Sequence, residues 1–230
     1  MMEEIKSMLH LDVMTVTGKT LGENLEDLKK NGFYDKCESY LKKWGLKRTD
    51  VIRTFDEPIG TDGTVAILRG NLAPEGSVVK HSAVPKEMFK AVLKARPFDC
   101  EEDAIAAVLS HKIRPGDAVF IRYEGPKGSG MPEMFYTTEA ISSDPELGKT
   151  IALITDGRFS GASKGPAIGH VSPEAADGGP IALVEEGDLI RIDIPERVLE
   201  IVGIHGQEMT KEEVDKVLAE RRAAWKPKAP

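Results

Sequence analysis

Cysteine is scarce in this chain of 230 residues, in which Cys37 and Cys100 are the only two. Two thiols cannot build a disulfide framework or a four-thiolate metal site. Long apolar runs are also missing, and no stretch approaches the roughly 18 consecutive apolar residues that a membrane span needs. The first twelve residues, MMEEIKSMLHLD, contain no basic region followed by an apolar run, so they predict no secretory signal. These absences indicate a globular protein of the cytoplasm that does not interact with membranes.

The chain also lacks an excess of basic residues: it has 31 Lys and Arg against 38 Asp and Glu, which gives a formal net charge of −7. Binding to nucleic acid phosphates requires a concentrated basic surface, so this balance argues against a nucleic-acid partner. The hydrophobic fraction of 40% is sufficient for a core, and the length suits one large domain or two small ones. No spacing typical of histidine metal ligands occurs among His10, His81, His111 and His205.

Short β-branched runs alternate with a few helical patterns along the chain. Capping-box spacings open two of the helices, Thr20 with Glu23 and Thr210 with Glu213. Together these patterns predict a mixed α/β or barrel-like domain rather than a regular βαβ repeat. The predicted helices cover residues 20–30, 34–44, 100–109 and 211–225; the predicted strands cover 65–69, 77–80, 118–123, 150–154, 167–171, 181–184, 189–194 and 198–202.

A glycine-rich segment, Tyr123–Met134, follows the predicted strand at residues 118–123. Its glycines allow the backbone to approach a ligand closely. Its carboxylates, Glu124 and Glu133, are oxygen ligands suited to a hard cation. The alternative interpretation is a flexible surface loop with two solvated carboxylates.

A second segment, Thr155–Gly165, follows the predicted strand at residues 150–154 and contains the hydroxyls Ser160 and Ser163 among small residues. Backbone N–H groups in such a turn can form an anion-binding nest, and Arg158 and Lys164 add positive charge. Ser160 beside a glycine can be exposed on a sharp turn, as a nucleophile or a base requires. An ordinary hydrogen-bonded turn is the alternative.

A third segment, Gly169–Pro180, is expected to be structural and to set the angle between strands. His170 lies beside a predicted buried strand, where a histidine is more often a core residue than a titrating group. Cys100 stands at a predicted helix start, a position that favours a thiolate. Neither Cys37 nor Cys100 has a nearby cysteine partner, so both are expected to be buried or incidental thiols.

The sequence resembles the C-terminal part of the dihydroxy-acid dehydratase / 6-phosphogluconate dehydratase family. The resemblance is carried by five blocks in family order: Met14–Leu25, Leu68–Gly76, Glu124–Gly128, Thr155–Ser163 and Gly169–Val184. It implies a swivelling β/β/α domain, in which helices flank a barrel-like mixed sheet. It also implies a hydro-lyase that removes water from a 2,3-dihydroxy carboxylic acid, such as 2,3-dihydroxy-3-methylbutanoate, in branched-chain amino-acid biosynthesis.

The resemblance also implies roles for individual residues. Ser160 corresponds to the serine that takes the C2 proton as an alkoxide, and Glu133 corresponds to a magnesium ligand. We further expect Ser163 and Arg158 to bind the substrate. The complete enzyme of this family uses an iron–sulfur cluster and Mg²⁺ and is expected to be a homodimer, whereas the cluster ligands match nothing in this chain.

Three domain regions are expected: a helical segment at residues 1–48, a β-rich core at 49–205, and a C-terminal helix and tail at 206–230. The N-terminal cluster-binding domain of the family is expected to be absent, as in a fragment or one product of a split gene. The isolated chain is therefore expected to be inactive without that domain as its partner. A sugar-acid dehydratase acting on arabonate, xylonate or 6-phosphogluconate, and a non-catalytic binding module, remain the alternatives.

Overall fold

The structure is a computed structural model that describes residues 1–60, 62–161 and 163–228. The chain divides into two compact units, unit 1 at Met1–Gly63 and unit 2 at Thr64–Pro230. None of the helices in the described ranges is long and apolar enough to cross a membrane.

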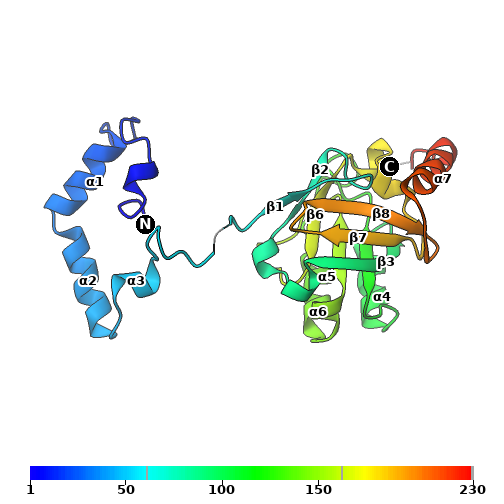
Figure 1. The fold of residues 1–230 in the computed structure, drawn as a ribbon, viewed down its shortest axis with the longest axis horizontal. Coiled ribbons are helices and arrows are strands. Elements are labelled where there is room, and N and C mark those ends of the chain that lie inside the picture. Colours follow the sequence, from blue (N-terminus) through cyan, green and yellow to red (C-terminus); the bar gives the residue numbers. More distant parts are fainter. Residues whose placement is uncertain (61, 162, 229–230) are drawn as a thin grey trace. The chain divides into compact units, whose positions relative to one another are not determined.

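Unit 1 is a short run of helices (Figure 1). It contains η1 (Lys6–Met8), α1 (Leu21–Lys30), α2 (Phe33–Lys43) and α3 (Arg48–Val51). The capping box predicted for α1 is confirmed, because the Glu23 N–H donates to the Thr20 hydroxyl while the Glu23 carboxylate accepts from the Thr20 N–H. Between α1 and α2, Gly32 adopts a left-handed φ of 67°, which separates the two helices.

Unit 2 is built on one nine-stranded sheet, in the order β1-β2-β6-β5-β4-β3-β7-β8-β9. Its central strands β3, β4, β5 and β6 run parallel, and the flanking pairs are antiparallel. An isolated bridge between Arg69 and Val198 connects the chain after β1 to β8, so the sheet curls back toward itself (Figure 1). The predicted class, a mixed α/β domain with a barrel-like sheet flanked by helices, is confirmed. The strands are β1 (Ala66–Leu68), β2 (Gly76–Val79), β3 (Lys90–Phe98), β4 (Asp117–Ile121), β5 (Ala152–Thr155), β6 (Ala167–Ser172), β7 (Leu189–Asp193), β8 (Val198–Ile204) and β9 (Gln207–Glu208).

Strand β4 shows how the sheet separates two apolar cores. Ala118 and Phe120 face the inside of the curl, while Val119 and Ile121 face the helices on the outside. Side chains alternate between the two faces of a strand, and here both faces are buried, which explains the continuous apolar run. The parallel register pairs Phe120 with Ile154 of β5, and this neighbour also faces the inner core.

The remaining helices lie outside the curl. The outer core packs under α4 (Glu101–Leu109), α5 (Phe135–Ser143) and α6 (Leu147–Thr150). The inner core continues to α7 (Lys211–Ala224), whose Val214 and Leu218 are buried. Short 3₁₀ turns complete unit 2: η2 (His81–Ala83), η3 (Lys86–Met88), η4 (Ala175–Asp177) and η5 (Pro180–Leu183).

The sequence-based strand at residues 181–184 is wrong, because this segment forms the 3₁₀ helix η5. Pro180 stands at its first position, where the fixed φ of proline favours helical geometry. A short apolar run has no periodicity that distinguishes a strand from a buried turn of helix. Strand β3 and helix α5 were not predicted. Lys90, Lys94 and Arg96 interrupt the apolar pattern of β3, and α5 begins with aromatic and threonine residues that favour strands.

Candidate functional site

The three polar segments singled out from the sequence leave the same edge of unit 2. Residues 123–134 follow β4, residues 156–165 follow β5, and residues 173–180 follow β6. Because these neighbouring strands are parallel, their carboxyl ends lie side by side. Ligands of open α/β sheets commonly bind just outside such carboxyl ends. We call these three segments together the loop edge.

Two of these loops are joined by backbone pairing at two candidate residues. Glu133 and Arg158 form an isolated parallel β-bridge. In the adjacent hydrogen bonds, the Met134 N–H donates to the Arg158 carbonyl at 2.8 Å and the Arg158 N–H to the Pro132 carbonyl at 3.4 Å. The structure thus places Glu133 next to Arg158. Arg158 in turn precedes Ser160 by two residues. The side chains of Glu133 and Arg158 are both exposed at the surface.

A buried aspartate, Asp156, connects all three loops. Its carboxylate accepts hydrogen bonds from the N–H groups of Glu124 at 3.0 Å, Tyr123 at 3.2 Å and Ala175 at 2.8 Å. The residue is 1% exposed. Burial raises the pKa of Asp156 above its ordinary value, although the three N–H groups act in the opposite direction. One side chain therefore fixes the first residues after β4, β5 and β6 in a single arrangement.

Glu174 holds the glycine-rich loop from the other side. Its buried carboxylate accepts from the Lys127 N–H at 3.0 Å and the Gly128 N–H at 3.1 Å. A Cβ at Gly128 would lie 2.2 Å from the Tyr123 carbonyl oxygen, so only glycine allows the loop to fold back this closely. The glycines of this loop permit backbone packing, and the loop is ordered by a carboxylate that lies 47 residues away in sequence from Lys127.

The serine turn after β5 is held by contacts from elsewhere in unit 2. Ser160 is half-buried, and its carbonyl accepts from the Ser163 N–H at 3.0 Å. Ser163 is buried, and its hydroxyl lies 3.5 Å from the hydroxyl of Thr138 on α5. The Lys80 ammonium group donates to the Gly161 carbonyl, which brings a positive charge to this turn. Ala162, the next residue of the motif, lies outside the described residues.

Backbone conformations at the loop edge are unusual for residues with side chains. Tyr123, Met131 and His170 adopt left-handed φ values of 65°, 62° and 55°. Such strain concentrates at functional sites. An open pocket of about 350 Å³ lies here, with Met131, Asp156 and His170 in its lining. His170 is exposed at this pocket, and its pKa is lowered by partial burial and by the charge of Arg158.

The loop edge by itself supplies few metal ligands. Within the ranges that the structure describes, no three His, Cys, Asp or Glu side chains form a group that could hold a metal ion. Of the two carboxylates considered in the glycine-rich loop, Glu124 is buried and accepts a hydrogen bond from Ser129, whereas Glu133 is exposed. Glu133 therefore offers one carboxylate, and the other ligands of a Mg²⁺ ion have to come from elsewhere.

The favoured thiolate at Cys100 is a wrong expectation. A backbone hydrogen bond at Asp103 lowers the pKa of the Cys100 thiol, but burial and the Asp103 and Glu102 carboxylates outweigh it, so the pKa is raised. Burial and two acidic residues in the first turn of α4 thus outweigh the effect of the helix terminus. Cys37 and Cys100 are both half-buried free thiols.

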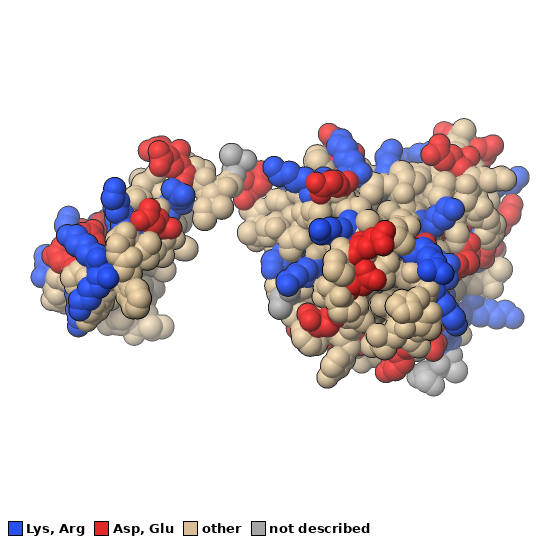
Figure 2. All heavy atoms as spheres, turned by 90° about the horizontal axis from the view of Figure 1, so that it is seen from below, with Lys and Arg blue, Asp and Glu red and all other residues tan. Residues whose placement is uncertain are grey.

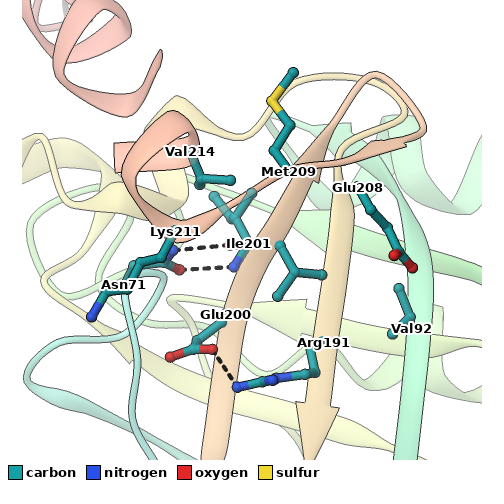
Figure 3. A pocket seen from close by; sticks show the side chains of 10 residues that line it. Asn71, Val92, Arg191, Glu200, Ile201, Glu208, Met209, Lys211 and Val214 are labelled. Carbon is teal, nitrogen blue, oxygen red and sulfur yellow. Dashed lines mark hydrogen bonds and ion pairs between the residues drawn. The ribbon is translucent and has the colours of Figure 1, made fainter. Parts of the chain in front are cut away.

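A larger pocket, of about 470 Å³, lies away from the loop edge, between β7, β8 and the start of α7 (Figure 3). Three of its polar side chains, those of Asn71, Arg191 and Glu200, are already paired with protein groups. Arg191 donates to Glu200 at 2.6 Å, and Asn71 exchanges two hydrogen bonds with the backbone of Ile201 at 2.8 and 2.9 Å (Figure 3). None of the site residues expected from the sequence lines this pocket. Its size therefore does not make it the functional site.

Sequence reasoning missed three residues that organise the loop edge, Asp156, Glu174 and Lys80. The first two lie inside motifs that were noticed, and a carboxylate directly after a buried strand was the available signal. Nothing near Lys80 in the sequence indicates that it contacts a turn 81 residues away.

Over the face shown in Figure 2, acidic and basic side chains are interspersed.

A family model described as dihydroxy-acid/6-phosphogluconate dehydratase, C-terminal, matches residues 50–230. The chain belongs to this family. It is 53% identical to a dihydroxy-acid dehydratase of Agathobacter rectalis over 224 residues, which cover 97% of this chain and 35% of that protein. It is 47% identical to the dihydroxy-acid dehydratase of Methanosarcina barkeri, over 98% of this chain and 37% of that protein. For the enzyme of Solidesulfovibrio magneticus the identity is 54%, over 86% of this chain and 33% of the relative.

These relatives are much longer than the present chain, which spans about 35% of the length of those it matches. The match with the first two relatives extends well beyond the family model, into residues 1–49. Both units of the chain therefore resemble segments of dihydroxy-acid dehydratases.

Proposed function

We propose that this chain supplies the C-terminal part of a hydro-lyase that converts 2,3-dihydroxy carboxylic acids, of the 2,3-dihydroxy-3-methylbutanoate type, to 2-keto acids. The proposal places the enzyme in branched-chain amino-acid biosynthesis. The observation that carries it is the β-bridge between Glu133 and Arg158, which joins the two loops that contain the proposed site residues at one edge of the sheet. The relatives described above, which are dihydroxy-acid dehydratases, support the same reaction.

In the proposed reaction, Ser160 takes the C2 proton of the substrate on its Oγ atom. The electron pair of the C2–H bond forms the C2–C3 double bond as the C3 hydroxyl departs as hydroxide, which together with the abstracted proton makes up the water lost. The enol product then gains a proton at C3 and loses the proton of its C2 hydroxyl to become the 2-keto acid. A serine hydroxyl is a weak base unless positive charge stabilises its alkoxide. The Lys80 ammonium group, held on the Gly161 carbonyl, and the Arg158 guanidinium two residues before Ser160 are two of the cations this chain brings to the turn.

Arg158 and Ser163 are assigned to substrate binding in this proposal. Arg158 is exposed beside the backbone bridge, where its guanidinium can pair with the substrate carboxylate. Ser163 is buried under the same turn and contacts Thr138. In this proposal its hydroxyl holds the turn through that contact and also contacts the substrate.

The proposal assigns Mg²⁺ and an iron–sulfur cluster to the complete enzyme. Glu133 fits one position of a Mg²⁺ site, because it is an exposed carboxylate held on paired backbone. The cluster does not fit this chain, because the only two thiols, Cys37 and Cys100, come from different units and no group of three metal ligands occurs among the described residues. The residues that hold the cluster are assigned to the remaining part of the enzyme.

The test combines this chain with the remaining N-terminal part of the Agathobacter rectalis enzyme, reconstituted with iron, sulfide and Mg²⁺ without oxygen. We expect 2-keto acid to form from 2,3-dihydroxy-3-methylbutanoate faster than from arabonate, xylonate or 6-phosphogluconate. The chain alone is expected to give no turnover. A stable complex without activity on any of these acids would favour a non-catalytic binding module, and preference for a sugar acid would overturn the substrate assignment.

A further inference from the structure

Unit 1 has almost no interior of its own. Of its described residues, Leu25 is the only one that is buried. Burial of apolar surface is the main favourable contribution to folding, so a unit of this length with one buried leucine is incomplete as a folded body. Many of its large apolar side chains are exposed instead: Met8, Met14, Val16, Phe33, Tyr40, Trp44, Leu46, Val51, Phe55 and Ile59.

The apolar side chains follow one face of α2 and continue beyond it. Phe33, Cys37, Tyr40 and Trp44 recur at helical spacing, and Trp44 is 82% exposed. Next to this helix, an apolar groove of about 160 Å³ opens between α2 and α3, with Phe33 and Val51 in its lining. Contiguous exposed apolar surface of this kind marks an interaction site. We call this surface the α2 face.

Three of the four charged residues that line the groove are paired within unit 1, and the fourth, Glu3, has one buried carboxylate oxygen without a hydrogen-bond partner. Arg48 forms ion pairs with Glu4 and, at 3.9 Å, with Glu38. On α1, Glu26 pairs with Lys6 at 2.7 Å. The exposed side chains of the α2 face are mainly aromatic; the Phe33 ring packs edge-on against Tyr34, and the Lys43 ammonium group lies over the Tyr40 ring. A partner that fits this face presents apolar side chains rather than a field of one charge.

The comparisons indicate which molecule supplies that partner. The C-terminal domain of the family begins at residue 50, whereas the dihydroxy-acid dehydratases of Agathobacter rectalis and Methanosarcina barkeri match 97% and 98% of the chain. Residues 1–49 are thus shared with these enzymes but lie outside their C-terminal domain. Nearly two thirds of each relative lies outside the matched segment.

We infer that the α2 face of unit 1 is the docking surface for the remaining, N-terminal part of a dihydroxy-acid dehydratase, and that unit 1 completes the apolar core of that part. This inference deepens the proposed function and rests on it for the identity of the partner. Unit 1 then acts as the anchor that holds the loop edge of unit 2 to the rest of the enzyme.

The experiment uses the full chain and the separately produced N-terminal part of the Agathobacter rectalis enzyme, and it measures their affinity by analytical ultracentrifugation. Replacement of two apolar anchors, Phe33→Ser with Trp44→Ser, is expected to weaken binding by at least about 30-fold, as for aromatic hot spots at protein interfaces. The control is Leu109→Ser, which removes a 65% exposed leucine at the end of α4 in unit 2 and is expected to leave affinity unchanged. Circular dichroism checks that α1 and α2 remain helical in each variant.

Four other outcomes overturn the inference, and a fifth tests the proposed function alone. Unchanged affinity of the double variant, or an equal loss in Leu109→Ser, shows that the α2 face is not the docking surface. Self-association of the chain that the double variant abolishes assigns the face to a second copy. A lower melting temperature of unit 2 in the double variant assigns it to the same chain. If the complex forms through this face but no dihydroxy acid is dehydrated, the proposed function fails while the docking surface stands.

Discussion

Two buried aspartates stabilise two regions of unit 2 in different ways. At the loop edge, Asp156 is 1% exposed and is surrounded by backbone N–H donors. At the α7 corner, which we define as Asp188 with the residues that bind it, the carboxylate is fully buried and pairs with the Arg221 guanidinium at 2.5 and 3.1 Å. It also accepts from the Glu185 N–H at 2.9 Å.

The difference separates a region built for stability from a region built for chemistry. The α7 corner neutralises its buried charge with a cation and closes the barrel against its last helix. The loop edge compensates its charge with partial backbone dipoles alone, so burial raises the pKa of Asp156. Dipoles hold the three loops in place without adding a formal charge, so under the proposed function the cations of the turn are left to act on Ser160 and the substrate.

The largest expected effect is on activity at the loop edge. Ser160→Ala in the assembled enzyme is expected to lower kcat by about 10²–10⁴-fold, the usual contribution of a general base. The free energy of unfolding is expected to remain unchanged, because a half-buried hydroxyl leaves little cavity. Steady-state kinetics and urea unfolding of the same variant measure both quantities.

Ser163→Ala is the matched control, because the two serines lie in one turn. Loss of the Ser163 hydroxyl is expected to reduce the stabilisation of the transition state by only about 0.5–1.5 kcal/mol, the contribution of one hydrogen bond, and so to lower activity much less than Ser160→Ala. Loss of activity in Ser163→Ala with full activity in Ser160→Ala would show that the base is assigned to the wrong serine.

The α7 corner is expected to show the largest loss of stability. Arg221→Met leaves the Asp188 charge buried without its cation, and breaking such a buried pair costs about 3–5 kcal/mol. Denaturant unfolding of the full chain measures the change. Arg191→Met is the control, because the Arg191–Glu200 pair is partly exposed and is expected to contribute at most about 1 kcal/mol. Equal effects of the two substitutions would contradict the distinction between the corner and an ordinary surface pair.

Asp156→Asn is expected to destabilise the chain by about 1–3 kcal/mol, because an amide cannot accept from all three N–H donors. The pKa of Asp156 is raised in the folded state, so the folded chain binds its proton more tightly than the unfolded chain. Ionisation of Asp156 therefore lowers stability as the pH rises from its ordinary value of 3.8 through the raised value. The stability difference between wild type and Asp156→Asn should shrink over that pH range in unfolding experiments. A difference that grows with pH would show that the N–H donors outweigh burial.

The smallest expected effect concerns the side chain of Lys127 in the glycine-rich loop. Lys127→Ala removes an exposed, solvent-screened ion pair with Asp177, so the free energy of unfolding is expected to stay nearly unchanged. The backbone N–H of the residue keeps its bond to Glu174, so hydrogen exchange at residues 127 and 128 should stay slow. Glu174→Ala is expected to accelerate exchange at both positions. Fast exchange in Lys127→Ala would show that the side chain, and not Glu174, orders the loop.

The strands of unit 2 that sequence predicted best are those buried on both faces. Residues 118–123 and 150–154 contain uninterrupted apolar runs, and β4 and β5 lie there. The helix at residues 211–225 was predicted from its capping box, which the structure confirms. Strand β3 was missed because exposed lysines, Lys90 and Lys94, interrupt its apolar pattern, although the whole strand pairs with β4 and β7. Such pairing depends on tertiary context that no local pattern contains.

The candidate site was predicted in its segments but not in its architecture. The position of Ser160 after a buried strand and the glycines near Glu133 are local signals. The backbone bridge from Glu133 to Arg158, the contacts of Asp156 and the reach of Lys80 all join residues distant in sequence. Their roles depend on which strands become neighbours in the sheet.

The bridge between Glu133 and Arg158 also has a consequence for engineering this family. Because the two loops share backbone hydrogen bonds, replacing the glycine-rich loop by that of a relative also changes the backbone against which the serine turn is held. If residues 123–134 alone are replaced, the introduced loop has to pair with the original segment around Arg158. Swapping residues 123–134 together with 156–165 keeps the paired register, and the two loops then form one transferable cassette for altering substrate preference.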